Sequence, residues 1–207
     1  MTGSSPPYAA GGSGAGPGGS GFSVTGERDL ARGSLVRLVE LDVTGPSGAS
    51  LRREVVRHPG AVIVVALEGD GVWLVRQYRA AVDREVLELP AGKRDVAGEP
   101  PDETARRELV EEVGRRASVL RYLGRFYNSP GFTDEETFCY LATELEPVER
   151  EPQGLEERHM AAELIAWGVL DRLAREGTLC DAKTLAGLAL ARGALGGPGA
   201  ADGAAGR

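Results

Sequence analysis

The chain has 207 residues, a net charge of −7 and a pI of about 5.0, which disfavour nucleic-acid binding through a basic surface. No apolar run approaches the roughly 20 residues of a membrane-spanning helix, and the N-terminus lacks the basic and apolar regions of a secretory signal. The two cysteines, Cys139 and Cys180, lie far apart in the chain and suit a reducing compartment. A cytoplasmic protein that binds neither membrane nor nucleic acid is therefore expected.

Composition divides the chain into four segments. Residues 1–22 consist mostly of Gly, Ser, Pro and Ala and are predicted to be a disordered tail, and the Gly- and Ala-rich residues 193–207 are predicted to be another. Residues 23–58 are predicted to contain N-terminal strands. Residues 59–192 remain as the main domain, which is long enough to bury a sizeable core.

The first half of the chain is rich in predicted strands. An apolar run with many β-branched residues, 61–67, predicts a strand that is buried on both faces. Pro90, Ala91 and Gly92 then end a predicted strand. The other segments in this half with apolar and polar residues in partial alternation are 36–43, 51–57, 72–78 and 85–89.

A helix is predicted from Pro101 or Asp102 to Gly114, because proline and acidic residues favour a first turn and glycine favours a helix end. Its apolar stripe, at spacings of four residues, would seat it on the sheet and leave the acidic side free to face a cleft. The stripe residues are Ala105, Leu109 and Val113.

Strands are predicted after this helix at residues 120–127, 136–145 and 164–167, and helices at 170–176 and 181–191. The order of mixed strands, one helix, strands and final helices favours an α/β/α sandwich around a mixed sheet. The N-terminal strands would form a small antiparallel sheet of their own.

Three carboxylates on the predicted helix form the most informative feature of the chain. Glu108 and Glu112 are four residues apart and lie on one face, with Glu111 beside them. Such a cluster repels itself unless cations neutralise it. One interpretation is a solvated acidic face with arginines nearby, and the other is a site for Mg²⁺ or Mn²⁺, which prefer oxygen ligands.

The segment from Gly92 to Arg115 resembles the Nudix box, the signature of the Nudix hydrolases, Gly-x5-Glu-x7-Arg-Glu-aliphatic-x-Glu-Glu-x-Gly-aliphatic. From Glu99 onward the match includes Arg107, the three carboxylates and Gly114. The sequence departs from the pattern twice. Six residues instead of five separate Gly92 from Glu99, and Arg115 stands where an aliphatic residue is usual.

Further segments resemble the ADP-ribose pyrophosphatase branch of that family. Pro130 stands sixteen residues after Gly114, which is similar to a feature of this branch. The other similar segments are residues 77–79, 88–93 and 181–190. The resemblance implies the Nudix fold, a divalent metal cofactor, a nucleoside diphosphate substrate and a homodimer formed through a hairpin in residues 23–58.

The resemblance also implies roles for individual residues. The metal ligands would be Glu108, Glu112 and the carbonyl of Ala91, with Glu111 assisting and Arg107 holding a neighbouring glutamate. Arg79 would contact phosphate or ribose, Glu88 would contact the substrate, and Gly131 would leave room for it. Arg52 or Arg53 would reach the site of a second subunit. The general base would be Glu157, with Glu156 and Glu135 as alternatives. Without the Nudix box, the pair Glu156 and Glu157 would be interpreted as ordinary solvated residues, and Arg79 and Glu88 as charges at strand ends.

The function predicted from these resemblances is metal-dependent hydrolysis of the pyrophosphate bond of ADP-ribose to AMP and ribose 5-phosphate. One alternative keeps the chemistry and changes the substrate to a nucleotide sugar such as GDP-mannose or to a dinucleoside polyphosphate. Another is a non-catalytic nucleotide sensor, although such proteins usually lose one or more of the box carboxylates, which this chain retains.

Overall fold

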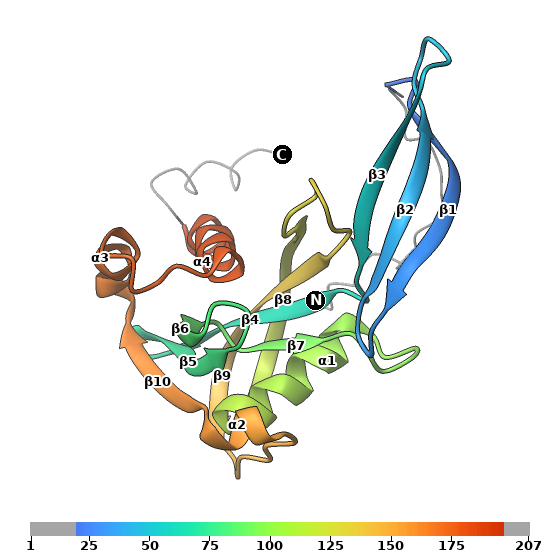
Figure 1. The fold of residues 1–207 in the computed structure, drawn as a ribbon. Coiled ribbons are helices and arrows are strands. Elements are labelled where there is room, and N and C mark those ends of the chain that lie inside the picture. Colours follow the sequence, from blue (N-terminus) through green and yellow to red (C-terminus); the bar gives the residue numbers. More distant parts are fainter. Residues whose placement is uncertain (1–19, 197–207) are drawn as a thin grey trace. The chain divides into compact units, whose positions relative to one another are not determined.

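The computed structural model describes residues 20–196, which divide into two compact units (Figure 1). One unit contains residues 20–59 together with Ser129–Glu135, and the other contains the remaining described residues. Residues 1–19 of the tail predicted at 1–22, and residues 197–207 of the tail predicted at 193–207, lie outside the described residues. None of the helices within residues 20–196 combines the length and the hydropathy needed to span a bilayer.

The N-terminal unit contains a three-stranded antiparallel sheet, formed by β1 (Ser23–Arg32), β2 (Arg37–Thr44) and β3 (Ser50–Arg57) in that order. Most side chains of β1 are exposed, and cross-strand ion pairs such as Arg28–Glu40 (2.6 Å) line the sheet. The predicted strands 36–43 and 51–57 correspond to β2 and β3. The small N-terminal antiparallel sheet of the prediction is therefore present.

Ser129–Glu135 packs against β3 within this unit. The backbone N–H of Val56 donates to the carbonyl of Phe132 (2.8 Å), and the Thr133 hydroxyl donates to the carbonyl of Val56 (2.9 Å). The Asp134 carboxylate accepts from the backbone N–H of His58 (2.9 Å) and from Arg57 (3.0 Å). This segment is therefore an ordered part of the N-terminal unit.

The main unit is built on a seven-stranded mixed sheet with the order β10-β5-β4-β9-β8, to which β6 and β7 add at β5 and β4. The pairing of β4 with β9 is parallel and the other pairings are antiparallel. The strands are β4 (Ala61–Glu68), β5 (Gly71–Arg79), β6 (Arg84–Glu88), β7 (Ala91–Lys93), β8 (Arg115–Tyr127), β9 (Glu136–Pro147) and β10 (Ala161–Ala166).

Helices cover both faces of this sheet (Figure 1). Val62 and Val64 of β4 pack in one core cluster with α1 (Pro101–Glu108) and the π-helical segment η1 (Leu109–Val113). Ile63 and Val65 face the opposite way and pack with α3 (Leu170–Arg175) and α4 (Ala182–Leu195). The alternation along β4 explains why its sequence is continuously apolar. The predicted α/β/α sandwich around a mixed sheet is confirmed.

Several element boundaries differ from the prediction. Ala91 and Gly92 were predicted to end a strand, but they belong to β7, which pairs with β4. That pairing is a tertiary contact that the local sequence does not encode. β8 begins at Arg115, five residues before the predicted strand, and the short helix α2 (Leu155–His159) was not predicted. Trp167 belongs to the 3-10 turn η2 (Trp167–Val169) and not to the preceding strand. Helix α4 continues to Leu195, so residues 193–195 are helical and do not belong to a tail.

Candidate active site

A cavity of about 230 Å³ in the main unit collects most of the acidic residues singled out in the sequence. It is lined from β5, from β7 and the turn after it, from α1–η1, and from the loop and helix around α2. Its charged residues are the carboxylates Asp95, Glu108, Glu111, Glu112, Glu156 and Glu157 and the basic residues Arg79, Lys93 and Arg107. The acidic side chains outnumber the basic ones, so the cavity attracts cations.

Helix α1 and segment η1 bring three of these carboxylates together. Pro101 occupies the first turn, and Gly114 ends the helical segment in the left-handed conformation with φ of 68°. The apolar stripe is buried as predicted, which fixes the opposite side of the helix toward the cavity. The π-helical turn Leu109–Val113 was not predicted, and such wider turns occur often at functional sites.

Arg107 connects the box glutamates. Its guanidinium donates to the carboxylates of Glu108 (2.8 Å), Glu111 (3.0 Å) and Glu99 (3.2 Å), and the Thr104 hydroxyl donates to Glu99 (2.7 Å). The pKa of Arg107 is raised, first by its hydrogen bonds to Glu99 and then by the charges of Glu108 and Glu111. Arg107 thus contacts three glutamates at once, and its predicted role in catalysis, which is to hold a neighbouring glutamate, stays a prediction.

Gly92 lies against the carboxylate of Glu108. A Cβ atom at Gly92 would lie 2.0 Å from Oε1 and 2.1 Å from Cγ of Glu108, a distance that no real pair of atoms tolerates. The first glycine of the box therefore leaves the space in which the Glu108 side chain lies.

The carboxylates of the helix are buried and resist ionisation. Burial raises the pKa of Glu108 to about 7; repulsion from Glu111 and Glu157 adds to the rise and Arg107 opposes it. Burial also raises the pKa of Glu111. Glu112 is 3 % exposed, and burial raises its pKa well above the ordinary value although its carboxylate accepts the backbone N–H of Ala91 (2.9 Å).

The donor set fits a hard divalent cation. The cavity offers carboxylate oxygens, which Mg²⁺ and Mn²⁺ prefer, and the raised pKa values show that the protein alone does not neutralise them. Within residues 20–196, no three acidic, His or Cys side chains are already arranged around one metal position. The helix carboxylates are instead hydrogen-bonded to Arg107 and to the backbone N–H of Ala91.

Glu157 faces the helix carboxylates from another element. It lies on α2, and its Oε2 accepts the backbone N–H of Gln153 (2.5 Å). Glu157 adds to the raised pKa values of Glu108, Glu111 and Glu112, which shows that its charge is felt at all three. Glu156 also lines the cavity.

Arg79 and Glu88 form a bidentate pair on the neighbouring strands β5 and β6. Arg79 Nε and Nη2 donate to the two oxygens of Glu88 at 2.7 and 2.6 Å. Arg79 lines the cavity, whereas the Glu88 side chain is only 3 % exposed. Glu88 therefore orients Arg79 in this structure, and its predicted contact with a substrate stays a prediction.

Four predicted residues, Arg52, its alternative Arg53, Gly131 and Glu135, lie in the N-terminal unit and do not line this cavity. Arg52 pairs with Asp42 (3.2 Å) on the sheet, and Gly131 and Glu135 belong to Ser129–Glu135. Their assignments to a substrate site, a second subunit's site and a general base stay predictions.

The sequence pattern of the NUDIX domain matches residues 56–187, which is more than half of the chain. The chain belongs to the Nudix family. It is 40 % identical over 171 residues to the ADP-ribose pyrophosphatase of Mycobacterium tuberculosis, covering 81 % of each chain. It is 38 % identical over 159 residues to the ADP-ribose pyrophosphatase of Bacillus subtilis, covering 76 % of this chain and 85 % of that one.

Solved structures confirm the Nudix fold. A crystal structure described as an ADP compounds hydrolase superposes with a TM-score of 0.74 at 23 % identity, covering 84 % of this chain and 94 % of the other. At that identity the likeness concerns the fold alone.

Both departures from the Nudix box have a structural explanation. Arg115 stacks over the ring of Trp73 (4.5 Å) and donates to Glu68 (2.8 Å), so its aliphatic stem and charge are both accommodated outside the cavity. The additional residue lies in the turn at 95–98, where Gly98 has a φ of 80° and an added Cβ would meet no atom within 4 Å. Glu99 still bonds Arg107 and Thr104.

Some lining residues were not predicted. Gln77 precedes Arg79 by two positions on β5, and Lys93 follows Ala91 by two positions on β7, so strand alternation places each pair on the same side. The alternation along β5 could have identified Gln77 as a lining residue. Lys93 could be identified only if β7 were known to be a strand, and Gln153 belongs to a loop without a periodic signal.

Proposed function

We propose that this Nudix protein hydrolyses the pyrophosphate bond of ADP-ribose, giving AMP and ribose 5-phosphate, with Mg²⁺ as the metal and Mn²⁺ as a substitute. The observation that carries the proposal is one cavity that receives Glu108, Glu111 and Glu112 from a helix and Glu157 from a second element. The ADP-ribose branch is supported by the names of the Mycobacterium tuberculosis and Bacillus subtilis relatives.

The metal would be held by Glu108, Glu112 and the carbonyl of Ala91, with Glu111 assisting. When bound, divalent ions neutralise charge that develops on pyrophosphate oxygens and make a water molecule easier to deprotonate. Arg107 keeps Glu108 and Glu111 together before metal arrives, since both carboxylates bond one guanidinium nitrogen. The raised pKa values indicate that metal and protons compete for these carboxylates.

Glu157 serves as the general base. It accepts a proton from the attacking water, whose oxygen forms a bond to one phosphorus while the bond from that phosphorus to the bridging oxygen breaks. Arg79 donates to the phosphates or the ribose, and Glu88 fixes its direction. Glu156 is the second candidate for the base because it lines the same cavity.

We also propose a homodimer formed through the N-terminal strands. β1 is largely exposed and has β2 as its partner within the described residues, so its other edge offers unpaired backbone groups to a second copy. Phe22 and Val24 are 54 % and 58 % exposed. Light scattering after size exclusion should give twice the mass of the chain, and a single-chain mass would contradict the dimer.

Product analysis tests the activity. The protein is incubated with ADP-ribose, GDP-mannose, ADP-glucose, NADH and diadenosine polyphosphates, with and without Mg²⁺. AMP and ribose 5-phosphate should appear fastest from ADP-ribose and only with metal. Faster turnover of another compound would keep the chemistry and reject the substrate. Tight binding of ADP-ribose without cleavage would favour the non-catalytic sensor.

Two variants distinguish the loss of a carboxylate in the cavity from the loss of a carboxylate elsewhere on the same helix. Glu112→Gln should lower kcat by about 10²–10³-fold, because it removes a metal oxygen in a buried site. Glu103→Gln is the control, since Glu103 lies on the same helix but is exposed and outside the cavity. Near-normal turnover of Glu112→Gln would contradict the proposed mechanism.

A further inference from the structure

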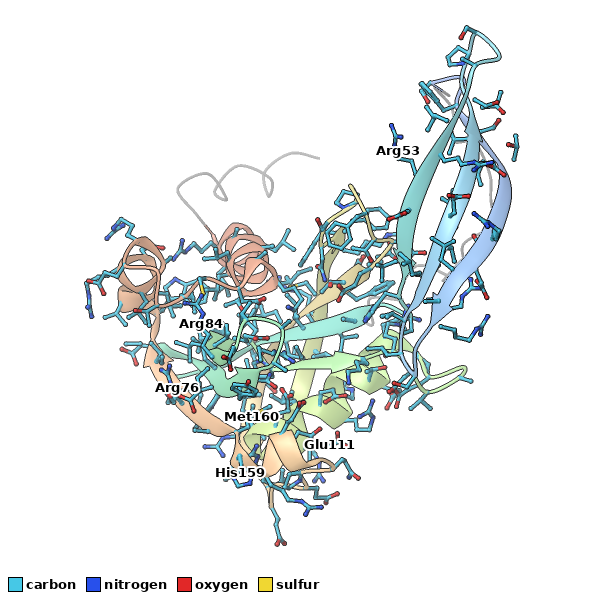
Figure 2. All side chains as sticks on the ribbon, in the orientation of Figure 1. Arg53, Arg76, Arg84, Glu111, His159 and Met160 are labelled. Atoms are coloured by element: carbon cyan, nitrogen blue, oxygen red, sulfur yellow. The ribbon has the colours of Figure 1, made fainter. Side chains whose placement is uncertain are left out.

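Arg150 lies between β9 and α2 and is not among the cavity-lining residues, but it bonds to both elements that carry the carboxylates. Its Nε donates to the backbone carbonyl of Glu111 (3.1 Å), its Nη1 to that of Met160 (2.9 Å) and its Nη2 to that of Glu157 (2.7 Å). Figure 2 labels Glu111 and Met160, which lie on η1 and directly after α2. One side chain therefore joins η1 to Glu157 of α2 and to Met160, the residue that follows α2.

The backbone next to Arg150 also contacts Gly114, the residue that ends η1. The Val148 N–H donates to the carbonyl of Gly114 (3.1 Å). A Cβ atom at Gly114 would lie 3.0 Å from the Val148 carbonyl oxygen and 3.5 Å from Cβ of Arg150. Gly114 thus permits the close approach of this chain segment. The last carbonyls of a helix lack partners within the helix, and Arg150 supplies one for Glu111.

Arginine is suited to this position because its planar guanidinium carries donors in fixed directions. Three different backbone carbonyls use its three nitrogens. A lysine ammonium carries one nitrogen on a flexible stem and would not hold the three carbonyls in the same geometry. The buried Met160 anchors the C-terminal end of α2 in the core, whereas Gln153 and Glu157 lie at the cavity.

We propose that Arg150 is a positioning residue that sets the distance between Glu157 and the carboxylates of η1. It acts through backbone carbonyls and touches neither the metal ligands' side chains nor the cavity. The inference rests on the proposed function, in which Glu157 takes the proton from water. A displacement of about 1 Å at such a group can cost about 10²-fold in rate.

The test combines kinetics with hydrogen exchange on the full chain. Arg150→Ala should lower kcat for ADP-ribose by about 10²-fold while KM changes by less than about threefold, and Arg150→Lys should recover part of the loss. Amides of residues 154–160 should exchange faster in Arg150→Ala. Mn²⁺ binding, measured by electron paramagnetic resonance, should stay within about twofold of the wild type, since Arg107 still holds the helix carboxylates.

The control is Arg106→Ala. Arg106 lies on α1 and bonds the carbonyl of Ala117 (2.9 Å), so its loss also removes a contact between a guanidinium and a backbone carbonyl, but outside the cavity. Arg106→Ala should leave kcat and the exchange of residues 154–160 unchanged. An equal fall in kcat in both variants would attribute the effect to general loss of stability and overturn the proposal.

A double-mutant cycle tests whether Arg150 acts on the rate through Glu157. In a Glu157→Gln background, Arg150→Ala should lower kcat by less than about threefold, because the group that Arg150 positions is already gone. A full additional loss in that background, or unchanged exchange in Arg150→Ala, would overturn the proposal. A wild-type protein that leaves ADP-ribose intact would instead reject the proposed function, while faster exchange in Arg150→Ala would still support the positioning of α2.

Discussion

Two helical layers cover opposite faces of β4 with opposite chemistry. Helix α4 packs on one face with Gly187, Leu188 and Ala191 buried. Helix α1 and η1 pack on the other face through an equivalent apolar stripe, yet the same turns also bury Glu108 and Glu112. Both layers contribute to the core, but within residues 20–196 the carboxylates whose pKa is raised by burial belong to the α1–η1 layer.

The contrast between the two layers explains how the protein can keep buried carboxylates in a stable domain. Burial of an unneutralised carboxylate is unfavourable and raises its pKa. Such groups persist in the α1–η1 layer because the apolar stripe and the α4 layer stabilise the unit independently of them. A metal ion that binds these carboxylates would neutralise their charge and relieve the unfavourable free energy of their burial. The binding of the metal is stronger for that reason, and it stabilises the folded state.

The largest expected effect is the loss of activity when Gly92, which lies against Glu108 of the α1–η1 layer, is replaced. Gly92→Ala should lower kcat by about 10²–10³-fold, because the new methyl group would occupy the space of the Glu108 carboxylate. Gly168→Ala is the control, since an added Cβ there meets no atom within 4 Å and the φ angle of Gly168 lies outside the left-handed region. Steady-state kinetics with ADP-ribose measures the change, and equal activity of both variants would show that the Glu108 position is unimportant.

The corresponding glycine on the α4 side should affect stability instead. In Gly187→Ala the Cβ would lie 2.7 Å from Cδ1 of Leu89 and 2.8 Å from Cδ1 of Ile63. Overpacking of this kind costs about 1–3 kcal/mol. Gly193→Ala lies on the same helix with free space around it and should stabilise by up to about 1 kcal/mol. Urea unfolding compares them, and equal midpoints would show that the α4 layer tolerates the added volume.

Sequence patterns predicted the scaffold better than the site. The stripe Ala105, Leu109 and Val113 and the apolar run of β4 carry their burial in their own periodicity, and both are buried as expected. The box spacing likewise placed Glu108, Glu111 and Glu112 in one cavity. These features are local, because a helix or strand determines which residues share a face.

The remaining features depend on contacts between distant segments. β7 is a strand because residues 91–93 pair with β4, and its three residues contain no periodic signal. Helix α2 is only five residues long and follows Gly154, and four of its residues are charged or polar, so its sequence carries no apolar periodicity that would predict a helix. Arg150 has no distinguishing neighbours in sequence, and its importance appears only when Glu111, Glu157 and Met160 meet around it.

The pH dependence of stability should differ between the two layers, and the α1–η1 layer should show the larger effect. The pKa of Glu108 is raised from 4.5 to about 7 in the folded state. Folded protein therefore holds this proton between those values while unfolded protein releases it. The contribution is fully present below pH 4.5 and is lost as pH rises through 7.

Without metal, the free energy of unfolding should fall between pH 5 and pH 8 by an amount on the order of 2 kcal/mol, because one unit of pKa shift corresponds to about 1.4 kcal/mol. Added Mg²⁺ should stabilise more at pH 8 than at pH 5.5, since protons no longer compete. Glu108→Gln should weaken both trends. Thermal unfolding at several pH values tests this, and a metal effect that is independent of pH would contradict it.

The α4 layer contains a half-buried carboxylate, Asp181, whose pKa is shifted in the opposite direction. Its side chain caps α4 by accepting from the backbone N–H and the hydroxyl of Thr184 (2.8 Å each), and the same hydroxyl accepts the N–H of Leu89 (2.8 Å). Burial alone would raise the pKa of Asp181, but the Lys183 ammonium and the Thr184 donors lower it below the ordinary 3.8. Protein groups alone thus satisfy this carboxylate.

The smallest expected effect follows from that contrast. Asp181→Ala should destabilise by about 1 kcal/mol, the usual cost of a lost helix cap, whereas Asp181→Asn should cost less because asparagine also caps. The carboxylate's contribution is present above pH 3.8 and is lost as pH falls through its lowered pKa, so Asp181→Asn should flatten the acid limb of the stability curve and leave the limb between pH 5 and 8 unchanged. The charge of Asp181 already contributes to the raised pKa of Arg79. A change between pH 5 and 8, or any gain or loss of Mg²⁺ stabilisation in Asp181→Asn, would mean that this charge also reaches the carboxylates of η1 and that the two layers do not act separately.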